Sequence, residues 1–299
     1  MKKYIGIDLG GTNVRVAKVT ADGEILAEVK SPSYAQEGPS KVMENLIRCI
    51  KEIEGWQDCA GIGVGVPGPV DTSKGEMLMA TNLPGFVHFP LAKTLEDEFH
   101  LPTFVDNDAN VAGLAEALVG AGKGLPIVYY VTHSTGIGGA LIVDGKVVSG
   151  KHGHAGEIGN IIIDRARKKY NHLNVGAVEN EVSGTALIRI AKETVDENIT
   201  SAGELFALAR SGNPQALDIV DTMAFDFAMM FSAIAHVCDP FAFIVGGGVM
   251  KSKDLYFDKM IEYYKQHVHT GMRTVEFKPA LLAEPGLIGA AMLPVSFGK

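Results

Sequence analysis

Cysteine is scarce in this chain of 299 residues. The chain contains only Cys49, Cys59 and Cys238, which lack the even number and regular spacing of a disulfide framework. Disulfides persist in oxidising compartments, where small secreted domains depend on them. The scarcity therefore argues against a disulfide-stabilised secreted protein and predicts a cytoplasmic one.

Positive charge and long apolar runs are also in short supply. Lys and Arg number 27 against 35 Asp and Glu, which gives a formal net charge of −8. A surface that binds nucleic acid or an anionic membrane needs a basic face. The excess of acidic residues therefore argues against both kinds of partner. The most apolar stretch, 227–250, is interrupted by His236, Asp239 and Pro240, and no signal-like apolar stretch precedes Asp8. A membrane span needs about 20 mostly apolar residues, so we expect a buried helix and then a strand in 227–250.

Two similar series of short strands stand out. The first runs through 4–9, 14–20 and 25–30, with a glycine-threonine turn after the first strand and an Asp-Gly turn after the second. The second begins at residue 127 and repeats the order of strand, glycine turn, strand and Asp-Gly turn. We interpret this repetition as an internal duplication. The chain length suits two domains, at roughly 100–200 residues each.

The rest of the pattern is mostly helical. Apolar residues recur at helical spacing in 42–53, with charged residues between them. Methionine and phenylalanine gather around 225–231, where we favour a core helix over an interface. We expect further helices at 108–121, 181–193, 202–210, 214–237 and 252–267, and strands at 60–66, 103–105, 128–132, 140–143 and 241–245.

Three glycine-rich turns, at 8–12, 134–139 and 246–248, each follow a predicted strand. Glycine lets the backbone approach a bulky anion, and backbone N–H groups bind phosphate without lysine. A simple hairpin turn explains one such motif equally well, and the P-loop pattern of Walker-type NTPases is absent. Together the three turns indicate a nucleotide site. Asp8, at the end of the first strand, could hold Mg²⁺ through water.

Polar residues also cluster at the strand–helix junction 105–110. Helix capping by Asp106 or Asn107 is one explanation. A carboxylate such as Asp108 could instead accept a substrate hydroxyl proton during phosphoryl transfer, while the Asn107 amide holds another hydroxyl.

A second polar cluster lies among the glycines of 150–160. His152 and His154 could be metal ligands, but no cysteine follows nearby, so this interpretation is weak. Glu157 and Asn160 fit better as hydrogen-bond partners of a polyhydroxyl ligand such as a sugar. A buried site of this kind rejects analogues that lack a hydroxyl, because its polar groups would be left unpaired.

Taken together, these segments resemble the ROK family of sugar kinases and repressors, which have the actin/hexokinase-type ATPase fold. The resemblance covers nearly the whole chain and rests on 8–12, 65–71, 82–86, 107–110, 135–139, 153–159, 246–248 and 286–291. It implies a two-domain α/β protein, built of duplicated ribonuclease H-like domains with the active site in the interdomain cleft. We predict a small N-terminal domain of residues 1–112 plus 287–299 and a large C-terminal domain of residues 113–286.

The resemblance also implies a role for each matching residue. Asp108 matches the family's catalytic base, which usually acts on the 6-hydroxyl of a hexose, and Asp8 matches the position near Mg²⁺. The family's phosphate-binding turns and adenosine motif match Gly10, Gly11, Thr12, Thr135, Gly136, Gly246 and Gly247. The expected sugar-binding residues are Gly68, Asn82, Asn107, Glu157, Asn160 and Glu179.

The sequence departs from the family at the zinc site of many members, which is formed by one histidine and three cysteines. The matching positions here hold Asn160, Tyr170, His172 and Ala177. Zinc prefers thiolate and imidazole ligands, usually four of them. We therefore predict a member without zinc, whose 164–176 stretch is ordered by packing. The missing histidine often touches sugar as well, so the choice of sugar stays open.

The function implied by the resemblance is an ATP- and Mg²⁺-dependent hexose kinase of the cytoplasm, forming a homodimer. The expected substrate is glucose or an N-acetylhexosamine such as N-acetylmannosamine, and a β-glucoside or another hexose is the alternative. A sugar-sensing regulator is the alternative from another class. Family repressors carry a DNA-binding segment before the first strand, which starts here at residue 4, so we expect a kinase.

Overall fold

The computed structural model describes residues 1–299, which form two compact units. Unit 1 comprises Met1–Tyr130, Ala140–Gly156 and Ala280–Lys299, and unit 2 comprises Val131–Gly139 and Glu157–Pro279. The domain boundaries expected at 112/113 and 286/287 stay a prediction. No helix is both long enough and apolar enough to span a membrane.

A five-stranded sheet forms the centre of unit 1, with strand order β3-β2-β1-β4-β8. The first three strands are antiparallel neighbours, whereas β4 pairs in parallel with both β1 and β8. This parallel pairing brings the ends of β1, β4 and β8 to one edge of the sheet. The strands are β1 (Lys3–Leu9), β2 (Asn13–Thr20), β3 (Ile25–Pro32), β4 (Ile62–Val66) and β8 (Thr103–Asn107).

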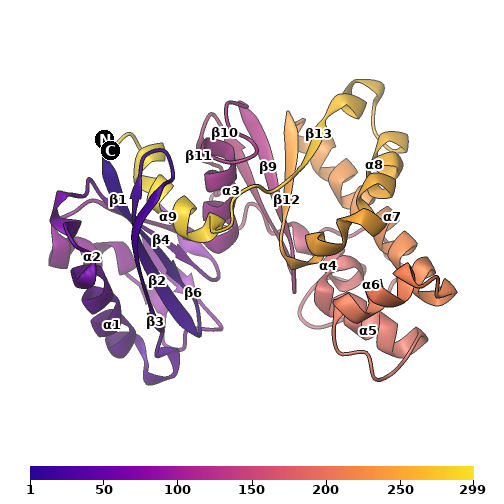
Figure 1. Ribbon diagram of the computed structural model, residues 1–299, viewed down its shortest axis with the longest axis horizontal. Coiled ribbons are helices and arrows are strands. Elements are labelled where there is room, and N and C mark those ends of the chain that lie inside the picture. Colours follow the sequence, from indigo (N-terminus) through magenta and orange to yellow (C-terminus); the bar gives the residue numbers. More distant parts are fainter. The chain divides into compact units, whose positions relative to one another are not determined.

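Side-chain alternation along β1 and β4 explains why helices cover both faces of this sheet (Figure 1). Ile5, Ile7 and Leu9 are buried in the core that also contains the apolar face of α1 (Pro39–Glu52). Gly6 faces α9 (Pro285–Ser296) instead, and a Cβ there would lie 2.4 Å from the carbonyl oxygen of Leu287. Glycine therefore lets α9 pack directly on the sheet. Helix α3 (Asp108–Leu118) also packs on α9.

A small three-stranded sheet, β5-β6-β7, lies between β4 and β8 in the sequence. None of its strands was predicted, because two to four residues are too few to show an alternating pattern. Helix α2 was missed as well, since its nine residues cover little more than two turns. These elements are β5 (Val70–Asp71), β6 (Glu76–Met79), β7 (Val87–Phe89) and α2 (Leu91–Phe99).

A second five-stranded sheet has the order β11-β10-β9-β12-β13. In sequence order this is the arrangement of the first sheet again: the third, second, first, fourth and fifth strands. The repeated topology agrees with the internal duplication expected from the two strand series. Its strands are β9 (Ile127–His133), β10 (Ile137–Val143), β11 (Lys146–Val147), β12 (Ala242–Gly246) and β13 (Glu276–Pro279).

Unit 2 contains most of the helices in the last third of the chain. The helix expected over 181–193 is split at Ser183, whose backbone is extended and whose side chain caps the next helix at Ala186 N. The helix expected from 252 begins only at Phe257, after a 3₁₀ segment. The elements are α4 (Glu179–Val182), α5 (Gly184–Thr194), α6 (Ala202–Arg210), α7 (Pro214–Cys238), η4 (Gly248–Leu255) and α8 (Phe257–Gln266).

Helix α7 is largely buried, as the sequence indicated for the apolar stretch after residue 227. Phe227, Met230 and Phe231 are completely buried, whereas Phe225 is 38% exposed. Most of the aromatic cluster is therefore core, and α7 is a fixed support for the elements that pack on it. The remaining short elements are the 3₁₀ turns η1 (Ala35–Glu37), η2 (Trp56–Asp58), η3 (Ile158–Asn160) and η5 (Thr270–Thr274).

Candidate active site

The first glycine turn joins β1 to β2 in unit 1. The N–H of Gly10 donates to the carbonyl of Asn13 at 2.9 Å, which closes the turn. A Cβ on Gly11 would lie 2.6 Å from the carbonyl oxygen of Asn82. Glycine is therefore needed for the Asn82 segment to lie against this turn. The structure thus brings together two predicted site segments that are about seventy residues apart in the sequence.

Asp8 lies at the end of β1, opposite Arg15 in the β1–β2 register. Burial raises the pKa of the Asp8 carboxyl; the positive charge of Arg15 opposes that shift, and Glu284 adds to it. Arg15 is itself bound by Glu28 at 2.8 Å and by Glu284. A Cβ on Gly286 would lie 3.7 Å from Asp8 Oδ2, so the start of α9 leaves room beside the carboxylate.

This environment fits a magnesium ion bound with its substrate. No group of three or more His, Cys, Asp or Glu side chains comes together to hold a metal by itself. Protein-bound Mg²⁺ commonly uses only one or two carboxylates, with water and substrate phosphates completing its octahedral shell. Asp8 offers one such hard oxygen donor.

The junction of β8 and α3 holds the polar pair Asn107 and Asp108. Asn107 caps α3 by accepting the N–H of Ala109 at 2.9 Å, so the capping explanation is correct. Its amide nitrogen also donates to the carbonyl of Gly68 at 3.1 Å. Gly68 has a φ of 83°, and a Cβ there would lie 2.4 Å from the carbonyl oxygen of Met79. Asp108 is the first residue of α3 and is exposed.

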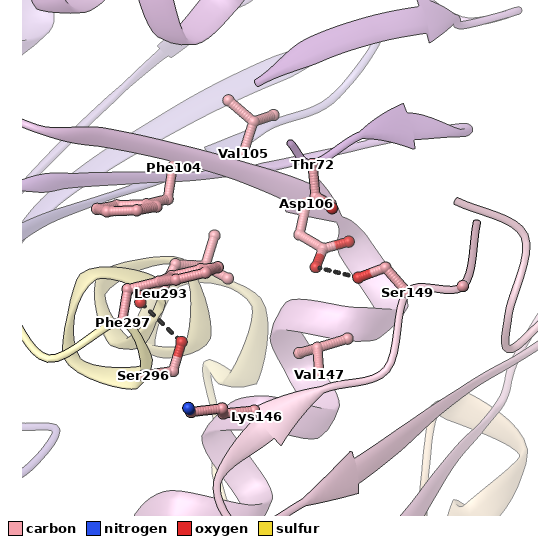
Figure 2. A pocket seen from close by; sticks show the side chains of 11 residues that line it. Thr72, Phe104, Val105, Asp106, Lys146, Val147, Ser149, Leu293, Ser296 and Phe297 are labelled. Atoms are coloured by element: carbon pink, nitrogen blue, oxygen red, sulfur yellow. Dashed lines mark hydrogen bonds between the residues drawn. The ribbon is translucent and has the colours of Figure 1, made fainter. Parts of the chain in front are cut away.

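Asp106, on β8, stabilises this junction through hydrogen bonds. It is 4% exposed, and its Oδ1 accepts the N–H of Asn107 and the amide of Asn110, both at 2.7 Å. Figure 2 shows its other oxygen turned toward Ser149, whose hydroxyl donates to it at 3.3 Å, beside a cavity of about 290 Å³. Burial raises the pKa of the Asp106 carboxyl, and these hydrogen bonds oppose the shift. The sequence suggested Asp106 only as a helix cap; the structure gives it the role of tying strand, helix and 149–150 segment together.

The second glycine turn, between β9 and β10, is closed by the N–H of Ser134 donating to the carbonyl of Gly136 at 3.0 Å. The carboxylate of Glu179 accepts the N–H of Ile137 at 2.8 Å. A Cβ on Gly136 would lie 2.8 Å from Glu179 Oε2. A predicted sugar contact therefore lies directly against a predicted phosphate turn.

The third glycine turn follows β12 and lies against the end of β9. Gly247 has a φ of 97°, and a Cβ there would lie 2.3 Å from the carbonyl oxygen of His133. His133 is completely buried, and burial lowers its pKa to about 4. Its Nε2 lies 2.7 Å from the carbonyl of Val182, which can only accept, so Nε2 carries the proton. Nδ1 then accepts the hydroxyl of Tyr256 at 3.1 Å. A neutral histidine thus joins β9, α4 and the segment before α8.

The second and third turns border one cavity of about 410 Å³ in unit 2. Ser134 and Thr135 line it from one turn and Gly248 from the other, while Ile188 and Phe206 give it apolar walls. This combination suits a nucleoside with phosphates, because phosphates bind turn N–H groups and a base packs on apolar side chains. One wall of this cavity was not predicted from the sequence; it is formed by Gly184, Thr185, Ile188, Ala202, Gly203 and Phe206. The Ser-Gly-Thr start of α5 was the only local signal for it.

The remaining predicted sugar contacts lie near Glu179. A Cβ on Gly159 would lie 3.0 Å from Glu179 Oε2, so the 157–160 segment packs on this carboxylate. Glu157 and Asn160 are exposed, and Asn160 Oδ1 accepts the N–H of Asn174 at 2.8 Å. His152 and His154 belong to unit 1 and are exposed as well.

The predicted site residues therefore form two groups. Unit 1 holds Asp8, Gly10, Gly11, Thr12, Gly68, Asn82, Asn107 and Asp108, and unit 2 holds Thr135, Gly136, Glu157, Asn160, Glu179, Gly246 and Gly247. Within each unit, contacts join some of these residues from distant parts of the sequence: Gly11 with Asn82, Asn107 with Gly68, and Gly136 with Glu179. Their binding roles stay predictions.

Comparison with known proteins places this arrangement in a family. The profile of the ROK family matches residues 4–296. The chain is 32% identical to a glucokinase of Halalkalibacterium halodurans, over 97% of this chain and 94% of the relative. It is 29% identical to an N-acetylmannosamine kinase of Escherichia coli, over 97% of both chains.

Solved structures give the same result for the fold. A ROK hexokinase from Thermus thermophilus has a TM-score of 0.89 and 32% identity, covering 99% of this chain and 100% of its own. A ROK glucokinase from Streptomyces griseus, in complex with glucose and AMPPNP, has a TM-score of 0.76 and 29% identity, covering 97% and 98%. The predicted two-domain actin/hexokinase-like fold is confirmed.

Proposed function

This chain belongs to the ROK family and is a sugar phosphotransferase, and we propose that it transfers the γ-phosphoryl group of ATP to the 6-hydroxyl of a hexose. The observation that carries the proposal is the exposed carboxylate of Asp108, which begins α3 directly after the Asn107 cap. A carboxylate fixed at a strand–helix junction is suited to accept a proton from a substrate hydroxyl.

In the proposed reaction, Asp108 takes the proton of the 6-hydroxyl as that oxygen bonds to the γ-phosphorus. The bond between this phosphorus and the β,γ-bridging oxygen breaks, and ADP leaves. Asn107 restricts the position of Asp108, because its side chain is bound both to Gly68 and to the first turn of α3. Most of the rate enhancement in such transfers comes from positioning and electrostatic stabilisation, and a general base adds roughly 10²–10⁴-fold.

Phosphate binding is assigned to the glycine turns. In unit 1, Gly11 and Thr12 offer backbone N–H groups and a hydroxyl, while Gly10 closes the turn through its own N–H. Thr135 and Gly136 offer the same groups in unit 2. The cavity of about 410 Å³ beside Thr135 would hold the adenosine. The AMPPNP bound to the Streptomyces griseus relative supports ATP as the donor. Mg²⁺, held through water by Asp8, would neutralise charge on the transferring phosphates.

Sugar binding is assigned to Gly68, Asn82, Asn107, Glu157, Asn160 and Glu179. Carboxylates and amides can pair with several hydroxyls at once, which suits a hexose better than an apolar substrate. The glucose in the Streptomyces griseus structure and the two relatives' names support glucose or an N-acetylhexosamine such as N-acetylmannosamine. A β-glucoside remains the alternative substrate.

The test is ADP release from Mg-ATP across a panel of glucose, mannose, fructose, allose, N-acetylglucosamine, N-acetylmannosamine and a β-glucoside. We expect turnover on one of them, with a loss of 10²-fold or more in Asp108→Asn. Asp258→Asn is the matched control, because Asp258 is likewise an exposed aspartate in the first turn of a helix. It should keep full activity.

Two outcomes would contradict the proposal. Equal turnover of the Asp108→Asn variant and the wild type would remove Asp108 as the base. Folded protein that binds AMPPNP but turns over no sugar of the panel would favour the sugar-sensing regulator instead.

A further inference from the structure

The 164–176 loop of unit 2 begins and ends beside predicted sugar contacts. Its ends are joined where the N–H of Ile163 donates to the carbonyl of Gly176 and that of Val178 to Ile161, both at 2.9 Å. Asn160 directly precedes this pairing and Glu179 directly follows it. Any movement at the base of the loop would therefore shift both residues.

Arg167, near the start of this loop, connects it to two helices. Its Nη1 donates to Glu181 Oε2 at 2.8 Å, and its Nη2 donates to Asp226 Oδ1 at 3.0 Å. The two carboxylate side chains are only 9% and 4% exposed. Asp226 belongs to the buried helix α7, and Glu181 belongs to the four-residue helix α4 that also carries Glu179. Arg167 thus connects a fixed helix to the one that presents a predicted sugar contact.

The Asp226 carboxylate is buried but is paired with Arg167. Burial raises the pKa of Asp226 to about 6, while Arg167 opposes the shift. Glu181 and Asp164 are the other acidic groups that act on Asp226. Two buried carboxylates facing one guanidinium depend on that partner, because an unpaired buried charge is strongly unfavourable.

Further contacts hold the rest of the loop. The guanidinium of Arg189 stacks over the ring of Tyr170 at 3.7 Å and donates to the carbonyl of Asn180 at 2.6 Å. The amide of Asn180 donates to the carbonyl of Tyr170 at 3.3 Å. The side chain of Asn160 accepts the N–H of Asn174 at 2.8 Å. Three of these contacts join the loop to a residue outside it, and the bond between Arg189 and Asn180 links the two outside residues that hold Tyr170.

The four positions at which zinc would be expected do not fit that metal. They hold Asn160, Tyr170, His172 and Ala177, which offer one imidazole and no thiolate. Asn160 and Tyr170 are instead engaged in the loop contacts just described. At two of the four positions, the protein's own side chains therefore make contacts that hold the loop.

We infer that Arg167 is a positioning residue for sugar binding: its ion pairs with Glu181 and Asp226 hold the 164–176 loop and α4 so that Asn160 and Glu179 keep their arrangement. This inference rests on the proposed function, because it assigns Asn160 and Glu179 to the sugar. It makes sugar binding depend on an ion-pair cluster in place of a metal. Arg167 itself need not touch the substrate.

The test compares Arg167→Gln with Arg165→Gln, which removes the same charge from an exposed position of the same loop. For the sugar identified by the panel, we expect Arg167→Gln to raise KM by about tenfold or more, with KM for ATP within about twofold of wild type. Arg165→Gln should change neither constant. Trypsin cleavage after Lys168 and Lys169, followed by mass spectrometry, should be at least tenfold faster in Arg167→Gln alone.

A second variant covers the case in which Arg167→Gln fails to fold because two carboxylates lose their partner. The triple variant Arg167→Gln/Glu181→Gln/Asp226→Asn removes all three charges and should fold, with the same rise in sugar KM and in loop cleavage. A folded single or triple variant with unchanged sugar KM and unchanged cleavage would overturn the inference.

Metal dependence gives an independent readout. Treatment of the wild type with 1,10-phenanthroline, followed by assay with added Mg²⁺, should leave sugar KM and loop cleavage unchanged. A loss of sugar binding that zinc restores would overturn the inference. If the wild type turns over no sugar, the proposed function fails, while the cleavage comparison still decides whether Arg167 holds the loop.

Discussion

The carboxylate of Glu179 accepts a hydrogen bond from the backbone N–H of Ile137, with 2.8 Å between the two atoms. One residue is the first of α4, and the other begins β10 directly after the second glycine turn. The bond therefore joins a predicted sugar contact to a predicted phosphate turn within unit 2. A sugar that binds Glu179 and shifts its carboxylate would also shift the turn that is bonded to it. Binding of sugar and binding of ATP should therefore be coupled.

Substitution of Glu179 tests this coupling. Glu179→Gln keeps an acceptor for Ile137 N–H, so we expect a higher KM for sugar and little change in KM for ATP. Glu179→Ala leaves the N–H without its partner, which costs about 1–3 kcal/mol, so the KM values of both substrates should rise by about tenfold or more. Steady-state kinetics with each substrate varied in turn measure this. An unchanged KM for ATP in the alanine variant would show that the bond does not influence the turn.

Asn107 has two roles that substitution can separate. Asn107→Asp keeps the oxygen that caps α3 but replaces the amide nitrogen that donates to the carbonyl of Gly68. We expect near-normal stability and a lower kcat, because residue 107, which restricts the position of Asp108, would no longer be bound to the carbonyl of Gly68. Asn107→Ala also loses the cap and should be about 1 kcal/mol less stable. Urea unfolding and turnover, measured on both variants, distinguish the roles; equal stability of the two would contradict the cap.

Adjacent glycines provide a matched pair in the third turn. Gly247→Ala would place a Cβ 2.3 Å from the carbonyl oxygen of His133 at a φ of 97°, whereas a Cβ on Gly248 would lie 4.0 Å from its nearest neighbour, Ser134 Oγ. We expect Gly247→Ala to lose about 2 kcal/mol or more of stability and to bind AMPPNP more weakly. Gly248→Ala should fold normally. Calorimetric titration and urea unfolding check both; a normal Gly247→Ala variant would contradict the close approach of the turn to β9.

The buried His133 predicts a loss of stability in acid. Its pKa is lowered from 6.5 to about 4, so the unfolded chain takes up a proton below pH 6.5 while the folded state resists it until about pH 4. The free energy of unfolding should therefore fall as pH decreases through this range, by about 2 kcal/mol at pH 5 from this group. Urea unfolding at pH 7.5 and 5.0 should show a smaller decrease in His133→Gln. An equal decrease in both proteins would refute this role.

Those parts of the candidate site that lie within short sequence segments were predicted from the sequence. The glycine turns, the Asn107–Asp108 junction and the strands before them were visible because turn residues and alternating apolar residues are short-range patterns. The three-stranded sheet, the apolar wall of the 410 Å³ cavity and the role of Asp106 were not visible. The strands of the sheet were too short to show an alternating pattern, whereas the apolar wall and the role of Asp106 depend on contacts between segments that are far apart in the sequence.

The sequence by itself determined the repeated strand–turn–strand pattern, the positions of the glycine-rich turns and the replacement of the zinc ligands. Each follows from the chemistry of single residues and their neighbours. Only the tertiary structure decided that Glu179 would meet Ile137, 42 residues away, and that Arg167 would meet Asp226, 59 residues away. Such pairs form when sheets and helices pack, because burial brings polar groups together and leaves them stable only with a partner. The sequence therefore specified which groups were available, and packing determined which of them act together.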